Sequence, residues 1–236
     1  MRKRTRGGGT ARRGGQGRGS AAWKRCYGPG VIVEAFIDYS SPFAYLGSTQ
    51  IERVARAHGG EVVFRPFLLG ALFKAIGTPL VPLESFSPAK ERYYRLELER
   101  WSARWGVPFT FSTRFPLRTV DALRLTLLAP EAKRAALVHA IMRATWAEDR
   151  DPSDRAVLEA ACIDAGVETG LLDRLAEGKQ LLFEATEDAR ARGVPGAPTF
   201  VVHTTRGPEL FWGQDRLSLV AAALAGVVAP PLPVDP

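Results

Sequence analysis

The first strongly patterned part of the chain is a short run of β-branched and aromatic residues at 32–37. Two serines end this run, and a proline then leads a segment with apolar side chains at helical spacing, up to residue 57. A second apolar run, at 61–64, follows a pair of glycines. A strand, a helix and a strand of these lengths predict a right-handed βαβ unit. A sheet is therefore expected to begin here.

The middle of the chain, from about residue 71 to residue 192, has a different pattern. Apolar residues recur there at the spacing of a helix, and prolines and glycines separate the segments. No segment in it predicts a convincing strand. The expected helices cover residues 90–105, 120–128, 131–147, 154–166 and 179–192.

A β pattern returns towards the C-terminus. Strands are predicted at 198–203 and 209–212, joined by a turn, and a final helix is predicted at 213–224. The complete order is βαβ, then helices, then ββα. This order predicts an α/β protein with a thioredoxin-like fold that carries an α-helical insertion at about 71–192.

Composition separates a central domain, expected at 30–227, from two ends. Residues 1–29 are rich in arginine and glycine, with almost nothing to bury, so we expect them to be disordered. Residues 228–236 form a proline-rich tail without room for regular structure.

The positive charge of the chain also lies at its N-terminus. The formal net charge is +7, but the first 25 residues hold nine Lys or Arg and no acid, which leaves 23 basic and 25 acidic residues elsewhere. This basic segment is either an RNA-binding arm or an incidental extension. The extension is favoured because no aromatic residue alternates with the glycines to stack on bases, so nucleic acid is not expected as a partner.

Two cysteines, Cys26 and Cys162, lie far apart and form no metal or redox spacing, so we expect neither a zinc site nor a dithiol site. A disulfide between them stays open from the sequence, although free thiols in a reducing compartment are the simpler interpretation. No apolar run reaches the ~20 residues of a membrane span, and the N-terminus lacks the apolar part of a secretory signal. A cytoplasmic location is expected.

The tryptophans and histidines are not assigned to a functional site from the sequence. Tryptophans on helical stripes either line a pocket or pack in the core, and core packing is favoured; they are Trp101, Trp105 and Trp146. No histidine has a partner at metal-binding or catalytic spacing; the three are His58, His139 and His203.

The turn between the first strand and the first helix carries the most informative motif, Ser41-Pro42-Phe43-Ala44. Proline is tolerated at the first helical position, so Ser41 is predicted to be the N-cap. The free amides of the first turn attract an anion such as a thiolate. Because the motif contains no sulfur, a thiolate must arrive on a cofactor, and Ser41 would donate a hydrogen bond to it. The alternative is that Ser41 is only an N-cap.

Three further segments accompany this turn in the same order along the chain. They are Arg-Pro-Phe-Leu-Leu-Gly at 65–70, Gly-Val-Pro-Gly-Ala-Pro-Thr-Phe with the strand after it at 193–202, and Phe-Trp-Gly-Gln-Asp-Arg-Leu at 211–217. Together with residues 38–47 they resemble the 2-hydroxychromene-2-carboxylate isomerase family, which is close to kappa-class glutathione transferases in the DsbA-like thioredoxin group. The resemblance covers about residues 31–225. It implies glutathione, or another low-molecular-weight thiol, as cofactor.

The resemblance also implies roles for individual residues. Ser41 is similar to the serine that holds and activates the glutathione thiol, with Pro42 and Phe43 beside it in the binding turn. Pro198 stands where thioredoxin-like proteins keep a cis-proline. The backbone of Ala197, the residue before it, would then pair with the cysteinyl part of glutathione.

The γ-glutamyl end of glutathione is assigned, by the same resemblance, to Gln214 and Asp215 at the start of the last helix, with Asp215 facing the ammonium group. The family often has asparagine at the position of Thr78, which donates one hydrogen bond but lacks the paired groups of an amide. Lys74, nearby, either neutralises a ligand carboxylate or is an ordinary solvated lysine.

The implied activity is glutathione-dependent cis-trans isomerisation of a small molecule, an intermediate of aromatic degradation. The thiolate adds to a conjugated enone, a bond rotates, and elimination restores the alkene and the thiol. One alternative is a kappa-like glutathione transferase or peroxidase. Another is a non-catalytic thioredoxin-like module that binds peptides at the edge beside Pro198. The resemblance also leaves a homodimer open.

Overall fold

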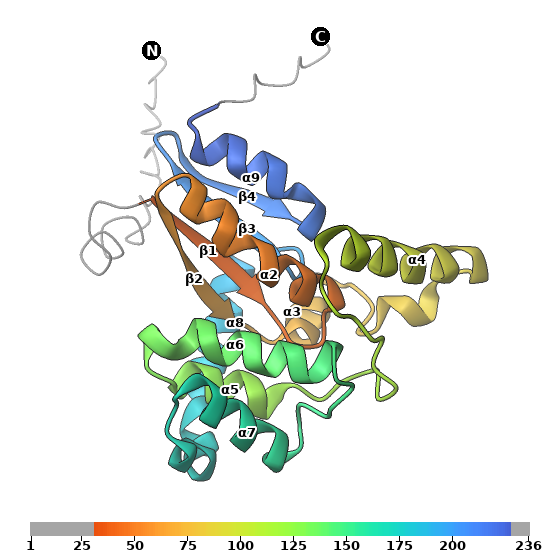
Figure 1. Ribbon diagram of the computed structural model, residues 1–236, viewed down its shortest axis with the longest axis vertical. Coiled ribbons are helices and arrows are strands. Elements are labelled where there is room, and N and C mark those ends of the chain that lie inside the picture. Colours follow the sequence, from red (N-terminus) through yellow and green to blue (C-terminus); the bar gives the residue numbers. More distant parts are fainter. Residues whose placement is uncertain (1–30, 228–236) are drawn as a thin grey trace, which may run out of the picture. The chain divides into compact units, whose positions relative to one another are not determined.

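Four strands form one mixed sheet in the computed structural model, which describes residues 31–227 (Figure 1). The strands lie side by side in the order β2-β1-β3-β4. β1 pairs in parallel with β2 and antiparallel with β3, and β3 forms a hairpin with β4. Their bounds are β1 (Val31–Ile37), β2 (Gly60–Pro66), β3 (Thr199–Thr204) and β4 (Gly207–Trp212).

Helices make up the long segment between β2 and β3. α2 (Pro42–Ala57) joins β1 to β2, and η3 (Gln214–Arg216) and α9 (Leu217–Leu224) follow β4. No strand occurs between residues 67 and 198, so the predicted thioredoxin-like fold with a helical insertion is confirmed. The insertion contains α3 (Leu69–Ile76), η1 (Pro82–Ser85), α4 (Pro88–Trp105), α5 (Val120–Leu128), α6 (Glu131–Trp146), α7 (Arg155–Ala165), η2 (Thr169–Glu177) and α8 (Gly178–Ala191).

The alternation of side chains along β1 assigns its two faces to different helices. Val33 and Ala35 belong to the larger apolar core, with residues of α2, α6 and α9. Phe36 belongs to a smaller core with Leu72 of α3 and Ala189 of α8. Figure 1 accordingly shows α2 and α9 over one face of the sheet and α8 behind the other. Both faces of the sheet are therefore covered.

The insertion is fastened directly to the turn after β1. Trp146 of α6 is fully buried, and its indole Nε1 donates to the Tyr39 carbonyl at 2.8 Å. The Tyr39 hydroxyl lies 2.5 Å from Thr126 Oγ1 of α5. Trp146 is thus a core residue, as the sequence favoured. These bonds fix the backbone two residues before Ser41.

A buried ion cluster lies on the β1 face that α8 covers. The Glu34 carboxylate accepts from Arg65 Nε at 2.7 Å and from Arg192 Nη2 at 2.6 Å. His203 Nε2 lies 2.7 Å from the same carboxylate. Burial alone would raise the pKa of Glu34, but the hydrogen bonds and positive charges of its partners outweigh burial and hold that pKa far below its ordinary value. His203 therefore has a carboxylate partner here, and His139 has one in Glu52 at 2.8 Å.

The structure differs from the sequence-based elements in three places. α3 and η2 were not expected, so the insertion begins at Leu69 rather than near 71. The last helix does not begin at Gly213, whose φ of 111° is left-handed, but passes through the 3-10 turn η3 before α9. The predicted disordered segment 1–29 and tail 228–236, together with Cys26, lie outside the described residues.

Candidate functional site

The turn after β1 presents Ser41 as the predicted N-cap of α2. Its Oγ accepts from the Ala44 backbone N–H at 3.2 Å, and Pro42 occupies the first helical position. The Phe43 N–H, at the second helical position, donates to no other described residue. A free amide at the positive end of a helix is the feature that holds an anion.

The carboxylate of Asp38 connects the turn after β1 to the starts of α3 and α5 through hydrogen bonds. Oδ1 accepts from the Ser40 N–H at 2.9 Å and from Thr119 Oγ1 at 2.8 Å, and Oδ2 accepts from the Leu69 N–H at 2.8 Å. Ser41 begins α2, Leu69 begins α3, and Thr119 is the N-cap of α5. Three helices therefore start around one carboxylate, which is 1% exposed. Its burial raises the pKa of Asp38, although these donors act in the opposite direction.

The segment that leads into β3 contacts Ser41 directly. The Ala197–Pro198 peptide bond is cis, and the Ala197 carbonyl accepts from Ser41 Oγ at 2.8 Å. Close packing of α2 against β3 makes this meeting possible. A Cβ at Gly47 of α2 would lie 3.2 Å from Phe200 Cζ of β3 and 3.3 Å from Pro198 Cγ, so glycine lets the two elements approach this closely without displacing a neighbour.

The segment after β4 lies beside Pro198 and contributes residues to the same site. The Gly213 N–H donates to the Pro198 carbonyl at 3.0 Å, and the left-handed φ of Gly213 turns the chain into η3. Gln214 is only 6% exposed, yet its amide has no hydrogen-bond partner among residues 31–227. Asp215 lies 3.6 Å from Arg216 across an exposed ion pair. The amide atoms of Gln214 are not enclosed by protein, so they are open to a ligand in the cavity that this residue lines.

All of these groups line one cavity of about 740 Å³. Its wall near Ser41 is polar, whereas its far wall is apolar and comes from the insertion. The apolar wall includes Trp101 of α4, so this half-buried tryptophan lines a pocket as well as packing on the core. Further lining residues are Pro42, Phe43, Leu68, Phe73, Val81, Phe86, Tyr94, Phe115, Leu117, Arg118, Ala197, Pro198, Gln214 and Asp215.

Two candidates from the sequence lie outside the cavity wall. Thr78 follows α3, is half-buried and donates its backbone N–H to the Phe73 carbonyl at 2.9 Å. Lys74 is exposed on α3. The structure thus brings together Ser41, Pro42, Phe43, Ala197, Pro198, Gln214 and Asp215, and does not add Thr78 or Lys74 to them.

Sequence reasoning missed three residues that the fold brings to the cavity. Asp38 was signalled by its place at the end of a strand, directly before a helix start, but received no role. Tyr94 and Arg118 belong to the insertion, and no local pattern marks either as part of a site. Only the tertiary position of α4 and of the loop before α5 reveals them.

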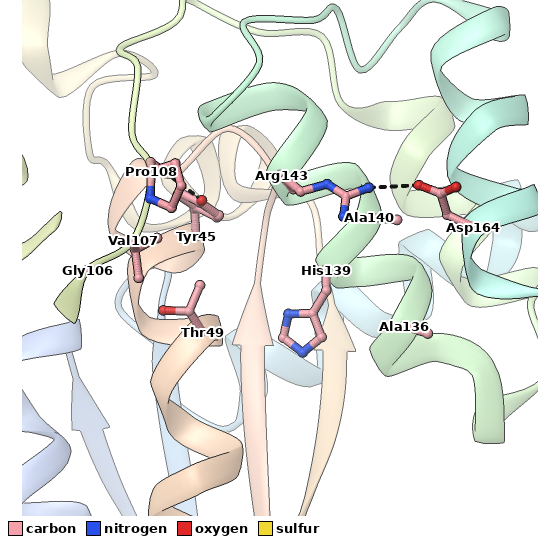
Figure 2. Close-up of a pocket in the computed structure, with 10 residues that line it drawn as sticks. All are labelled: Tyr45, Thr49, Gly106, Val107, Pro108, Ala136, His139, Ala140, Arg143 and Asp164. Atoms are coloured by element: carbon pink, nitrogen blue, oxygen red, sulfur yellow. Dashed lines mark hydrogen bonds and ion pairs between the residues drawn. The ribbon is translucent and has the colours of Figure 1, made fainter.

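A second, smaller pocket of about 380 Å³ lies between α2 and α6 (Figure 2). Its polar groups already have partners within the protein. Arg143 donates to Asp164 at 2.7 Å, and the Tyr45 hydroxyl donates to the Pro108 carbonyl at 2.7 Å. The cavity at Ser41 is therefore the better candidate site.

Other kinds of site were sought within the same range. Residues 31–227 contain no cluster of three His, Cys, Asp or Glu able to hold a metal. Cys162 is a free, buried thiol, and burial raises its pKa. No helix in this range is both long and apolar enough to cross a membrane.

Comparison with characterised proteins gives relatives of two kinds. The chain is 25% identical to a 2-hydroxychromene-2-carboxylate isomerase of Pseudomonas putida, over 82% of this chain and 94% of the relative. It is 28% identical to one of Sphingobium xenophagum, over 81% and 97%. It is also 26% identical to glutathione S-transferase kappa 1 of Rattus norvegicus, over 86% and 94%.

Solved structures share the fold. A 2-hydroxychromene-2-carboxylate isomerase structure superposes with a TM-score of 0.74 at 24% identity, covering 83% of this chain and 95% of that one. A probable DsbA oxidoreductase from Streptomyces coelicolor gives 0.67 at 22% identity, covering 87% and 94%. Residues 32–225 match the family model of the DSBA-like thioredoxin domain. This chain therefore belongs to the DSBA-like thioredoxin domain family.

Proposed function

We propose that this protein is an isomerase that uses glutathione to interconvert the cis and trans forms of a small conjugated substrate. The observation that carries the proposal is the meeting of Ser41, at the start of α2, with the Ala197 carbonyl, on the wall of a largely apolar cavity. The similarity to proteins named 2-hydroxychromene-2-carboxylate isomerase and glutathione S-transferase kappa 1 supports the reaction class and the thiol.

The polar wall offers a complementary group for each part of glutathione. The Ala197 carbonyl would accept from the cysteinyl N–H, as an open strand edge does for a peptide. The unpartnered amide of Gln214 and the carboxylate of Asp215 would bind the γ-glutamyl end, with Asp215 facing its ammonium group. Pro42 and Phe43 would flank the sulfur. Thr78 has no part in this arrangement, because it does not line the cavity.

Activation of the thiol follows from groups at the start of α2. When the ligand N–H takes over the Ala197 carbonyl, the Ser41 hydroxyl is released and turns its proton to the sulfur, while it still accepts from Ala44. The free Phe43 N–H and the helix dipole add to this stabilisation of the thiolate. A cysteine thiol has a pKa of about 8.5, and lowering it by one unit takes ~1.4 kcal/mol, which is within the reach of such donors.

The bound thiolate then acts as a temporary nucleophile. It adds to the β-carbon of a conjugated enone, which leaves a single bond where the alkene was. Rotation about that bond and expulsion of the thiolate give the other isomer and regenerate glutathione. A kappa-like transferase would stop at the adduct, so product analysis separates the two reactions. Consumption of the thiol with a stable conjugate would identify the transferase.

Replacement of Ser41 by alanine tests the proposal. Ser41→Ala should lose about 1 kcal/mol of capping and keep its fold, but lose most thiol-dependent turnover. The measurements are isothermal calorimetry with glutathione, the ultraviolet absorbance of the bound thiolate, and isomerisation of the probe enone cis-benzylideneacetone. Ser48→Ala is the matched control, because Ser48 is equally buried in α2 but donates to Tyr45 and lies outside the cavity. Thiolate absorbance and turnover in Ser41→Ala equal to those of the unmodified protein would remove Ser41 from the mechanism.

Two broader properties accompany this function. We place the enzyme in the cytoplasm, where glutathione keeps thiols such as Cys162 reduced. The homodimer implied by the family resemblance stays an expectation, which sedimentation of the full chain would decide.

A further inference from the structure

We propose that Tyr94 is a second catalytic residue of this site. Its hydroxyl would donate a hydrogen bond to the substrate oxygen that becomes negative when the thiolate adds to the enone. This inference rests on the proposed function, because it concerns the electrophile that the bound thiolate attacks. It goes beyond that function by naming the group that stabilises the intermediate.

Tyr94 lines the same cavity as Ser41. It lies on α4, and its ring meets the Phe43 ring edge-on, with centroids 5.1 Å apart and planes at 82°. Phe86 packs against it in the same manner at 5.8 Å and 71°. Because Phe43 stands two residues after Ser41, these contacts fix the phenol relative to the start of α2.

The hydroxyl of Tyr94 has no hydrogen-bond partner among residues 31–227. Tyr94 is half-buried, and the two buried tyrosines in this range differ from it, because Tyr39 pairs with Thr126 and Tyr45 donates to the Pro108 carbonyl. Buried phenols usually find such a partner. A phenol in a cavity wall without one is available to a ligand.

The surroundings of Tyr94 also keep it in the donating form. Burial among aromatic rings raises its pKa to about 12, so the hydroxyl is protonated throughout the physiological range. The nearby cation of Arg95 acts in the opposite direction and does not overcome this. A neutral phenol donates to an oxyanion without bringing a charge of its own into the apolar wall.

The other side-chain hydroxyls on the cavity wall lie around Asp38, which interacts with the Ser40 side chain. In the proposed function the Ser41 hydroxyl donates to the thiolate sulfur, and the Thr119 hydroxyl donates to Asp38. Arg118 is exposed and cationic, so it would contact a charged group of a ligand rather than a buried carbonyl. Tyr94 is thus the neutral side-chain hydroxyl left for the electrophile.

The reaction step balances without any further reagent. The thiolate forms a carbon–sulfur bond at the β-carbon, and the alkene electron pair moves to the carbonyl oxygen as an enolate. Tyr94 shares its proton with that oxygen. After rotation the enolate pair returns to form the alkene, the carbon–sulfur bond breaks, and the proton stays on Tyr94. No atom is oxidised or reduced.

The test compares two neighbouring tyrosines on one helix. Tyr94→Phe keeps the aromatic packing and breaks no hydrogen bond within the described protein, so its fold should be preserved. Loss of a single oxyanion donor typically lowers kcat about 100-fold or more, and that loss is expected with cis-benzylideneacetone and glutathione. Tyr93→Phe is the matched control, because Tyr93 is 58% exposed and does not line the cavity. It should turn over the enone at the unmodified rate.

A second readout separates this role from thiol activation. Glutathione affinity by calorimetry and thiolate absorbance against pH should be unchanged in Tyr94→Phe, whereas both change in Ser41→Ala. Equal turnover in Tyr94→Phe and in the unmodified protein would overturn the inference alone. An unmodified protein that ionises glutathione but leaves the enone unchanged would overturn both this inference and the proposed isomerisation. Absence of glutathione binding in the unmodified protein would instead overturn the proposed function.

Discussion

Two polar side chains of the cavity, Ser41 and Gln214, differ in the hydrogen bonds that they make within the protein. Ser41 both donates and accepts within the protein, to Ala197 and from Ala44. Gln214 is equally buried but has no partner in the described part of the chain. The hydroxyl of Ser41 is therefore satisfied within the protein, whereas the amide of Gln214, which is open to the cavity, is available to a ligand.

Gln214→Leu should separate binding from stability. Leucine keeps the apolar volume beside Gly47 and removes an amide that the protein does not use, so the melting temperature should stay the same or rise. Glutathione affinity should fall about 10-fold, or ~1.4 kcal/mol. Calorimetry and thermal unfolding measure the two effects.

Gln50→Leu serves as the control for Gln214→Leu. Gln50 is also buried, but its side chain accepts from Arg53 and donates to Thr49. Its replacement should lower stability and leave affinity unchanged. Unchanged glutathione affinity in Gln214→Leu would show that Gln214 does not contact the thiol.

Local chemistry explains which site residues the sequence predicts. Ser41 stands beside a helix-starting proline, and Ala197 and Pro198 precede a clear strand, so short-range patterns mark them. Tyr94 sits on a helix whose sequence is largely polar, and nothing nearby distinguishes it from Tyr93. Its role depends on where α4 packs, which no single-sequence pattern encodes.

The same distinction applies to whole elements. α2 carries its own N-cap in Ser41, and the sequence predicts it with the same bounds. α3 was missed because its start is capped from elsewhere: Leu68 supplies no side-chain cap, and the Leu69 N–H donates to Asp38, 31 residues earlier in the chain. A helix whose first amide depends on a distant carboxylate has no local start signal.

Gly47→Ala tests the close approach of α2 and β3. A helical alanine gains up to ~1 kcal/mol over glycine, but the new methyl would lie 3.2 Å from Phe200 Cζ and 3.3 Å from Pro198 Cγ. The two effects should leave stability nearly unchanged, while α2 shifts and separates Ser41 from the Ala197 carbonyl. Weaker glutathione binding is the expected result, measured by calorimetry beside urea unfolding.

Gly170→Ala, in η2, is the comparison for Gly47→Ala, because Gly170 lies outside the cavity and its methyl would meet only the flexible Glu168 side chain. It should retain glutathione affinity. Undiminished affinity in Gly47→Ala would show that the spacing of α2 and β3 does not control the site.

At the scale of the described domain, residues 31–227, the ion cluster around Glu34 and the cavity at Ser41 are separate regions with different roles. The Glu34 cluster joins β1, β2, β3 and the end of α8 through Arg65, His203 and Arg192. None of these residues lines the cavity at Ser41. The cluster should therefore affect folding and leave thiol chemistry unchanged.

Acid should weaken the fold through Glu34. Its pKa in the folded protein lies below its ordinary value of 4.5, so the stabilisation is present above that value and is lost as the pH falls through and below it. Glu34→Gln should be destabilised by roughly 3 kcal/mol at neutral pH, because the arginines keep their charge without a partner. Its melting temperature should then fall less than that of the unmodified protein below about pH 5. Parallel pH curves for the two proteins would contradict this role, and thiolate absorbance should be equal in both.

The convergence of three helix starts on Asp38 has an evolutionary consequence. Asp38 fixes the start of α2, where the free Phe43 N–H can attract an anion, and because every residue type except proline supplies such an amide, side-chain replacement during divergence leaves this attraction intact. A descendant can exchange serine for another nucleophile at position 41 and inherit the same electrostatic environment. In such a lineage the side chain at position 41 can change from one member to the next, while the backbone amides that face it persist with the path of the chain.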